Sequence, residues 1–253
     1  MKLSVLFDAV FFGGDPIESI KAVKEAGCDS VEFWSWRNKD VDLLKRTIKD
    51  LQMEVVAFMT EKISLTDPAF REQYVKDCIE TIKVARELEC NTIITTVGDL
   101  IPGIPRERQH QSIVDGLKRV APLFEETGIT LVVEPLNVKV DLYHSNYFLS
   151  SSEEAFQIID KVGSSNVKVL YDIYHQQISE GNLIINITKN IDKIGHIHAA
   201  GHPGRNEITK GEINYQAVIQ AIKSTSYNGY FGLEYTPTVD LSESIKVAKS
   251  LLY

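Results

Sequence analysis

Four polar side chains stand where an apolar run of the sequence ends, all in the C-terminal half of the chain. The runs LVVE, VLYD, HIH and FGLE finish on Glu134, Asp172, His198 and Glu234. One acid at such a position is usually a cap or an ion-pair partner, whereas three carboxylates brought together would repel each other unless a cation held them. Three carboxylates and one imidazole suit Mn²⁺, Mg²⁺ or Co²⁺. The alternative is a set of buried ion pairs with Arg205 or nearby lysines.

Other polar residues accompany these four positions. His175 follows Asp172 closely, and Arg205 lies in the loop HPGRNE. The guanidinium fork of Arg205 matches a carboxylate or a pair of sugar oxygens, although a solvated loop is the plain alternative. His196 precedes His198 by two residues and therefore points to the same side of its strand. We interpret His196 as a core histidine lying deeper than His198.

A second group of candidates lies in the N-terminal half, in the segment EFWSW, which contains Glu32, Trp34 and Trp36. Indole faces could wall a small polar substrate, or they could pack in the core. We take Glu32 and Trp34 as candidate substrate contacts. Three further residues could line the same site: Asp8, Thr96 and Asn137.

These residues belong to an alternation of strand-like and helix-like segments that runs along the whole chain. Apolar, β-type runs predict strands at residues 3–8, 30–34, 54–59, 92–97, 130–135, 167–171, 195–199 and 230–235. A helical stretch follows each one; the first begins at Asp15, with Pro16 and Glu18 completing the signature of a helix start.

Eight strands alternating with eight helices indicate parallel pairing with right-handed crossovers. Such units in 253 residues predict an α/β fold of the (β/α)₈ TIM-barrel type, as a single domain over residues 1–253. A doubly wound open sheet is the competitor, but the turn after the first strand, FGGD, lacks GxGxxG spacing. In a barrel of this kind, side chains at the C-terminal strand ends form the active site.

Composition excludes several classes of partner. The chain has 27 Lys and Arg against 35 Asp and Glu, a net charge of −8, so it would repel nucleic acid on average. No apolar stretch approaches the roughly 18 residues of a membrane span, and the start MKLSVLFDAVFF is interpreted as a strand, not a signal peptide. Three cysteines without a CxxC pair indicate reduced thiols. We expect a soluble cytoplasmic protein with a small-molecule substrate; the oligomeric state stays open, a homo-oligomer included.

Several segments resemble a known family. They are VEPLN, YDIYHQQISEGN, IGHIHAA, HPGRNE, GEINY and GLEYTP in the C-terminal half, with EFWSW as a weaker match. Together they resemble the hydroxypyruvate isomerase family of the xylose-isomerase-like barrels, to which the sugar 3-epimerases are related. The resemblance implies that Glu134, Asp172, His198 and Glu234 hold the metal. One position departs from the pattern: the isomerases have Gln where His198 stands, whereas the 3-epimerases have His. The substrate is therefore left open.

The resemblance also implies a mechanism. Both relatives move a proton next to a carbonyl group through an enediolate, which needs a base at the C–H and a cation at the oxygen. Glu134 and Glu234 would flank the substrate as the catalytic pair. We assign His175 and Arg205 to substrate oxygens, with Glu207 orienting Arg205.

The leading hypothesis is a metal-dependent isomerase that interconverts hydroxypyruvate and tartronate semialdehyde. The alternatives are a ketose 3-epimerase acting on a neutral sugar and a non-catalytic sugar-binding barrel. A DNA-repair endonuclease would need several metal ions and a basic face, which six histidines and a net charge of −8 argue against.

Overall fold

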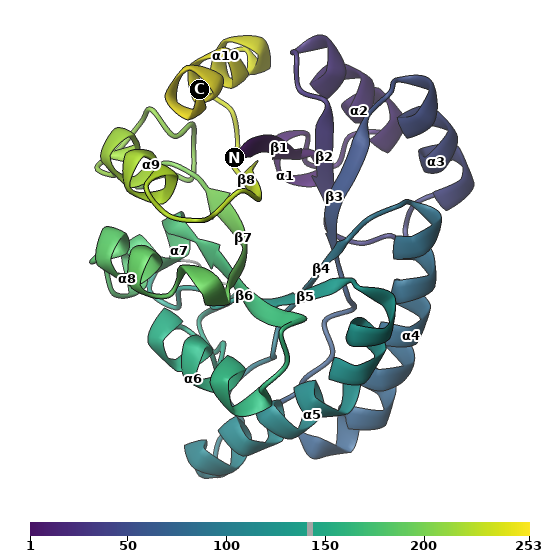
Figure 1. Cartoon of the computed structure of the whole chain (residues 1–253), viewed down its shortest axis with the longest axis vertical. Helices are drawn as coiled ribbons and strands as arrows, with labels where there is room; N and C mark the ends of the chain where they lie inside the picture. The colour runs from purple at the N-terminus through teal and green to yellow at the C-terminus, as the bar shows by residue number, and fades with distance from the viewer. Residues whose placement is uncertain (141–143) are drawn as a thin grey trace.

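Eight parallel strands close into a barrel in the order of the sequence (Figure 1). The computed structural model describes residues 1–140 and 144–253. Its strands are β1 (Lys2–Leu6), β2 (Ser30–Phe33), β3 (Glu54–Met59), β4 (Thr92–Thr95), β5 (Thr130–Val133), β6 (Val167–Asp172), β7 (Ile194–Ala199) and β8 (Tyr230–Leu233). Strand β8 pairs with β1, which completes the ring. The predicted TIM barrel is confirmed.

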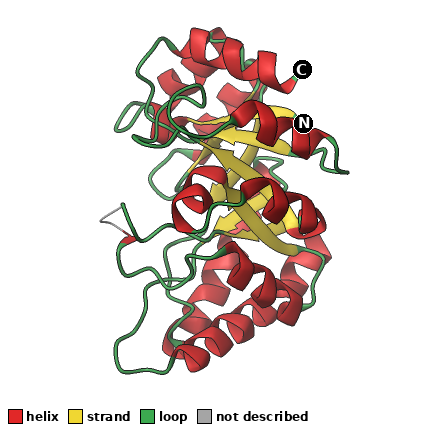
Figure 2. Cartoon of the chain, turned by 90° about the vertical axis from the view of Figure 1, so that its left-hand side faces the viewer, coloured by secondary structure: helices red, strands yellow, loops and turns green. Residues whose placement is uncertain are grey.

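The helices surround the strands on the outside of the barrel (Figure 1), and the longer loops project mainly on one side of it (Figure 2). The α-helices are α1 (Phe7–Val10), α2 (Pro16–Glu25), α3 (Val41–Asp50), α4 (Arg71–Glu87), α5 (Arg106–Thr127), α6 (Ser152–Val162), α7 (Ile173–Ser179), α8 (Leu183–Lys189), α9 (Tyr215–Lys223) and α10 (Leu241–Leu252). The short 3₁₀ helices η1 (Pro68–Phe70) and η3 (Ile191–Lys193) precede α4 and β7. None of the helices described is long and apolar enough to cross a membrane.

Local sequence signals set the helix boundaries. The Asp15 carboxylate accepts hydrogen bonds from the backbone N–H groups of Ile17 and Glu18, which is the predicted start of α2. Helix α6 begins in the same way, with the Ser151 side chain as its cap, and ends at Gly163, whose φ of 74° is left-handed. These caps fix where α2 and α6 begin.

Several predicted strands end earlier in the structure than in the sequence analysis. Strand β1 was predicted to reach residue 8, but it stops at Leu6 because the chain turns directly into α1. The fifth and eighth strands were predicted through residues 135 and 235, and they stop at Val133 and Leu233. Glu134 and Glu234, the next residues, still donate backbone hydrogen bonds to the neighbouring strand. Their side chains therefore stay anchored at the rim.

The apolar core lies between the sheet and the helices, and a smaller apolar cluster, made by Val56, Ala57, Ile94, Val132 and Leu170, joins strands β3 to β6. The three cysteines Cys28, Cys78 and Cys90 are buried and free, as predicted. This packed interior gives the strands a fixed register, so side chains at successive strand ends are held in constant relation to one another.

Candidate active site

The four predicted metal ligands meet at the C-terminal ends of β5 to β8. Ligand atoms of Glu134, Asp172, His198 and Glu234 all lie within 4.8 Å of one another, and all four residues are buried. They come from four successive strands, so the closed barrel brings together residues up to 100 positions apart in the chain. We call these four residues the acidic cluster.

Asp172 has a separate task for each carboxylate oxygen. Its Oδ1 accepts hydrogen bonds from the backbone N–H groups of Tyr174 and His175 and so caps α7, which begins where β6 ends. Its Oδ2 faces the cluster, 3.3 Å from Nη2 of Arg205. The cap fixes the rotation of the carboxylate, so the helix start orients a cluster oxygen. The sequence analysis did not predict α7.

His198 presents one ring nitrogen to the cluster and the other to Glu32. Its Nε2 lies 2.9 Å from Oε2 of Glu32, and its Nδ1 lies 3.0 Å from Oε2 of Glu234 but has no hydrogen bond of acceptable geometry. A buried imidazole nitrogen without a hydrogen bond, on a ring whose other nitrogen is held by a carboxylate, is typical of a metal ligand. The donor set therefore fits a hard divalent cation.

The carboxylates of the cluster differ in their ion pairs and in their protonation. Arg205 pairs with Asp172 and Glu234, so the ion pairs considered as an alternative are present, but among the described residues Glu134 has no ion pair. Burial, and then the charge of Glu234, raise the pKa of Glu134 to about 8. Burial also acts on Glu234, but Arg205 and His198 outweigh it and hold the pKa of that carboxyl below its usual range. In the metal-free protein Glu134 therefore keeps its proton near neutral pH, and a divalent cation held by the cluster would displace that proton.

Arg205 reaches the cluster with part of its hydrogen-bonding capacity unused. Nη2 lies 2.9 Å from Oε2 of Glu234, and the guanidinium lies over the Tyr174 ring, 5.1 Å from its centroid. Its Nε is buried and has no hydrogen-bond partner. A buried, unpaired guanidinium N–H beside a cation site is suited to an anionic ligand.

Asn137 sets the protonation of His175. Nδ1 of His175 accepts a hydrogen bond of 3.0 Å from the backbone N–H of Asn137, and the side-chain Nδ2 of Asn137 lies 2.8 Å from the same nitrogen. Because Nδ1 accepts, the ring proton is on Nε2, which lies 3.6 Å from Oδ2 of Asp172. Burial, and then Arg205, hold the pKa of His175 well below its usual value. His175 is thus a neutral donor facing the cluster.

Trp34 also reaches the cluster. Its Nε1 donates a hydrogen bond of 3.3 Å to Oε1 of Glu234, and its backbone N–H donates to Asp8, which Lys39 also contacts. The Phe12 ring packs edge-on against the Trp34 ring and is 82% exposed. The Trp34 indole therefore forms a wall of the site. Phe12, which packs against it, was not among the residues predicted from the sequence.

Two residues predicted to serve the substrate lie elsewhere. Glu32 is fully buried beneath the cluster and is hydrogen-bonded to Ser4, His196 and His198, so a direct substrate contact does not fit its position. Glu207 accepts hydrogen bonds from the backbone of Thr238 and Val239 and does not orient Arg205 as expected. It stabilises the loop after β8. His196 is a satisfied core histidine, as we interpreted it.

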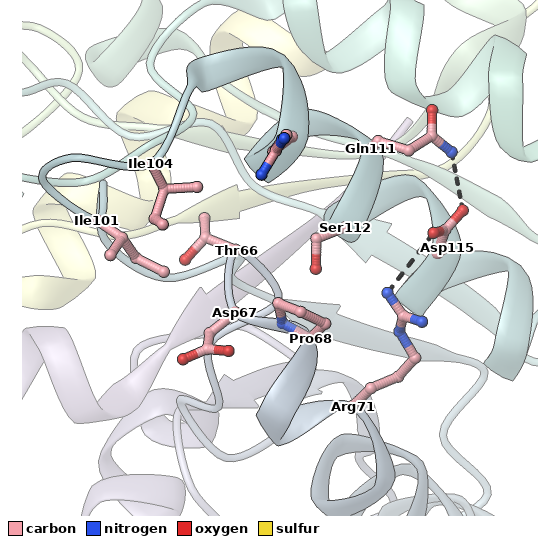
Figure 3. Close-up of a pocket in the computed structure, with 10 residues that line it drawn as sticks. Thr66, Asp67, Pro68, Arg71, Ile101, Ile104, Gln111, Ser112 and Asp115 are labelled. Carbon is pink, nitrogen blue, oxygen red and sulfur yellow. Dashed lines mark hydrogen bonds and ion pairs between the residues drawn. The ribbon is translucent and has the colours of Figure 1, made fainter.

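A cavity in the described part of the chain lies apart from this site (Figure 3). It has a volume of about 560 Å³ and is lined by residues that precede or begin α4 and by the first turns of α5. Arg71 pairs with Asp115, which also accepts from Gln111. None of the acidic cluster residues lines it, so this cavity is not part of the candidate active site.

Comparison with known proteins identifies the family. Residues 20–251 match the family model of the xylose isomerase-like TIM barrels. The chain belongs to this family. It is 30% identical to the hydroxypyruvate isomerase of Escherichia coli K12 over 245 residues, which cover 94% of each chain. It is 29% identical to the 2-oxo-tetronate isomerase of Pectobacterium atrosepticum, covering 93% of this chain and 90% of that one.

A solved structure supports the fold alone. The crystal structure of an AP endonuclease, family 2, from Brucella melitensis superposes with a TM-score of 0.92, at 24% identity and with 98% of each chain covered. At that identity the likeness does not transfer an activity.

The predicted resemblance to the isomerase branch of these barrels is confirmed, and so is the enzyme class.

Proposed function

We propose that this xylose isomerase-like barrel is a divalent-metal-dependent isomerase that interconverts hydroxypyruvate and tartronate semialdehyde, or a close 2-keto acid. The observation that carries the proposal is Arg205, whose buried and unpaired Nε lies on a side chain that contacts two members of the acidic cluster. A 2-keto acid has a carboxylate beside the reacting carbonyl. Its carboxylate would bind the free N–H of Arg205 while its carbonyl lies next to the acidic cluster. The named activities of two relatives point the same way.

The acidic cluster would hold the cation through Glu134, Asp172, Nδ1 of His198 and Glu234. A divalent ion there supplies Lewis-acid stabilisation of the negative charge that develops on the substrate oxygens. Arg205 binds the substrate carboxylate and thereby places the reacting carbons between the two glutamates. His175, as a neutral Nε2–H donor, holds a substrate oxygen without bringing a second positive charge.

Proton transfer is assigned to Glu134 and Glu234. One carboxylate removes a proton from C3 of hydroxypyruvate to give the enediolate, and the other returns a proton at C2. Movement of the hydroxyl proton from O3 to O2 completes tartronate semialdehyde, so no proton is gained or lost overall. The Trp34 indole donates to Glu234 and limits the rotation of that carboxylate.

A ketose 3-epimerase is the second candidate, favoured by one specific residue. His198 is the residue type that the 3-epimerases have at this position, and its Nε2 is held by Glu32 while its Nδ1 faces the cluster. An epimerase would return the proton to the opposite face of the same carbon. A neutral ketose, however, would leave the Arg205 guanidinium without an anionic partner.

The two candidates are separated by an activity panel. Purified protein is stripped of metal, reloaded with Mn²⁺, Mg²⁺ or Co²⁺, and offered hydroxypyruvate or neutral ketoses of four to six carbons. We expect metal-dependent aldehyde formation from hydroxypyruvate. Turnover of neutral ketoses alone, to C3 epimers, would refute the keto-acid assignment, and full activity in the presence of a chelator would refute the metal dependence.

A further inference from the structure

We propose that Glu32 is a positioning residue for the metal centre, acting through His198. It lies on β2, on the far side of the His198 ring from the acidic cluster, and it is completely buried. By accepting the Nε2 proton of His198, it fixes Nδ1 as the ring nitrogen that faces the cluster. This inference rests on the proposed metal-dependent function, and it concerns a residue that touches neither substrate nor metal.

The hydrogen bonds around Glu32 determine which ring nitrogen of His198 is available to bind a metal. Nε2 of His196 lies 3.0 Å from both oxygens of Glu32, Nε2 of His198 lies 2.9 Å from Oε2, and the Ser4 hydroxyl donates to Oε1. An ionised carboxylate accepts hydrogen bonds only, so each of these ring nitrogens carries a hydrogen. His198 can then offer only Nδ1 as a ligand.

Glu32, His196 and His198 also lie close enough together to be considered as a metal site of their own. All their facing atoms are satisfied by the hydrogen bonds just described, so this group needs no cation. Nδ1 of His198, on the other side of the ring, is the buried nitrogen without a hydrogen bond. Nε2 of His198 therefore has a structural role in the hydrogen bond to Glu32, whereas Nδ1 is free to bind the cation.

The barrel makes room for this network at Gly232 on β8. A Cβ atom at Gly232 would lie 2.5 Å from Oε1 of Glu32, 2.7 Å from Cδ2 of His198 and 3.2 Å from Nε2 of His196. Gly232 pairs with Ser4 on β1 and with His198 on β7. Residues of β1, β2, β7 and β8 thus form one interior layer, in which the glycine is a packing requirement of the carboxylate and the two rings.

The test measures metal affinity, not turnover. Glu32→Gln keeps one acceptor oxygen but turns an amide NH₂ toward an imidazole N–H, so one ring must change its tautomer. We expect the dissociation constant for Mn²⁺, measured by calorimetric titration at fixed pH, to rise about 10- to 100-fold. Asp77→Asn is the matched control, because Asp77 is also a buried acid and pairs with Arg37 outside this network. It should bind Mn²⁺ like the wild type.

A second pair of variants keeps the test informative if Glu32→Gln fails to fold. Ser4→Ala removes one hydrogen bond that holds Glu32 and should weaken Mn²⁺ binding in the same direction, by less. Gly232→Ala should weaken it too, whereas Gly116→Ala, whose Cβ would meet only the Leu65 side chain, should not. The visible spectrum of the Co²⁺-loaded protein should change in Ser4→Ala and in Gly232→Ala, because the orientation of the His198 ring as a metal ligand changes. It should stay the same in Gly116→Ala.

The outcomes are decisive in both directions. Unchanged Mn²⁺ affinity and an unchanged Co²⁺ spectrum in folded Glu32→Gln, or in Ser4→Ala together with Gly232→Ala, would overturn the positioning role. An equal loss of affinity in Asp77→Asn would also overturn it, because the effect would then be general. Failure of the proposed function looks different: the wild type would bind Mn²⁺, the variants would bind it weakly, and hydroxypyruvate would not be converted.

Discussion

Replacing Glu134 by Gln is expected to stabilise the metal-free protein although it removes a catalytic group. Burial and the nearby charge of Glu234 raise the pKa of Glu134 from 4.5 to about 8. Between these two values the unfolded chain has released the proton while the folded protein still holds it. The folded state then binds more protons than the unfolded state, so the free energy of unfolding falls as pH rises through this window. The neutral amide of Glu134→Gln does not titrate, so the variant does not lose this part of its free energy of unfolding as pH rises.

The size of the effect follows from the difference between the two pKa values. One pKa unit corresponds to about 1.36 kcal/mol, so at pH 8.5 the penalty approaches about 4 to 5 kcal/mol. At pH 5 only the first half unit of the window has been crossed, which corresponds to less than about 1 kcal/mol. Glu134→Gln should therefore gain about 3 to 5 kcal/mol at pH 8.5 and little at pH 5.

The assay is urea unfolding followed by far-ultraviolet circular dichroism, with a chelator present, at pH 5 and pH 8.5. Glu54→Gln is the control, because the Glu54 side chain is 47% exposed and lies at the start of β3 away from the cluster. Its difference from the wild type should be small at both pH values. A Glu134→Gln protein no more stable than the wild type at pH 8.5, or equally stabilised at pH 5, would refute the reasoning.

Three further outcomes are expected. Glu234→Gln should lower kcat for hydroxypyruvate by at least about 100-fold with an unchanged far-ultraviolet spectrum; near-normal turnover would contradict the two-glutamate assignment. Arg205→Lys should raise KM for hydroxypyruvate about 10- to 150-fold, because hydrogen bonds to a charged group contribute about 1.5 to 3 kcal/mol; an equal effect on a neutral ketose would remove the carboxylate role. Burial lowers the pKa of His198, but Glu32 and Glu234 outweigh it and hold it well above its usual value. Mn²⁺ must displace that proton, so affinity should fall from pH 8 to pH 6, with proton release seen by calorimetry in buffers of different ionisation enthalpy; equal affinity at both pH values would contradict this.

The barrel and the four members of the acidic cluster could be predicted because both depend on short-range patterns. Strands of β-branched and apolar residues alternate with capped helices, and in a parallel barrel each strand end points to the same rim. Glu134, Asp172, His198 and Glu234 interrupt the apolar runs just where a strand ends. Such interruptions are visible in the sequence without knowledge of which strands are neighbours.

The partners of these residues could not be predicted in the same way. Glu32 contacts His198 across 166 positions, because closure of the barrel brings the interior side chains of β2 and β7 together. The nearby Trp34 and Trp36 favour a substrate contact in the sequence, whereas in the structure Glu32 points into the barrel. Asn137 and His175 meet because the loop after β5 folds over the start of α7, and no periodicity marks that contact.

All four members of the acidic cluster come from one arc of the barrel, β5 to β8, while the loops after β1 and β2 contribute the aromatic wall of Trp34 and Phe12. The N-terminal half thus contributes an aromatic wall to a site whose proposed metal ligands, and whose Arg205, all come from the C-terminal half. Exchange of the early loops between relatives would change the surface that a substrate packs against while leaving the acidic cluster residues and Arg205 in place.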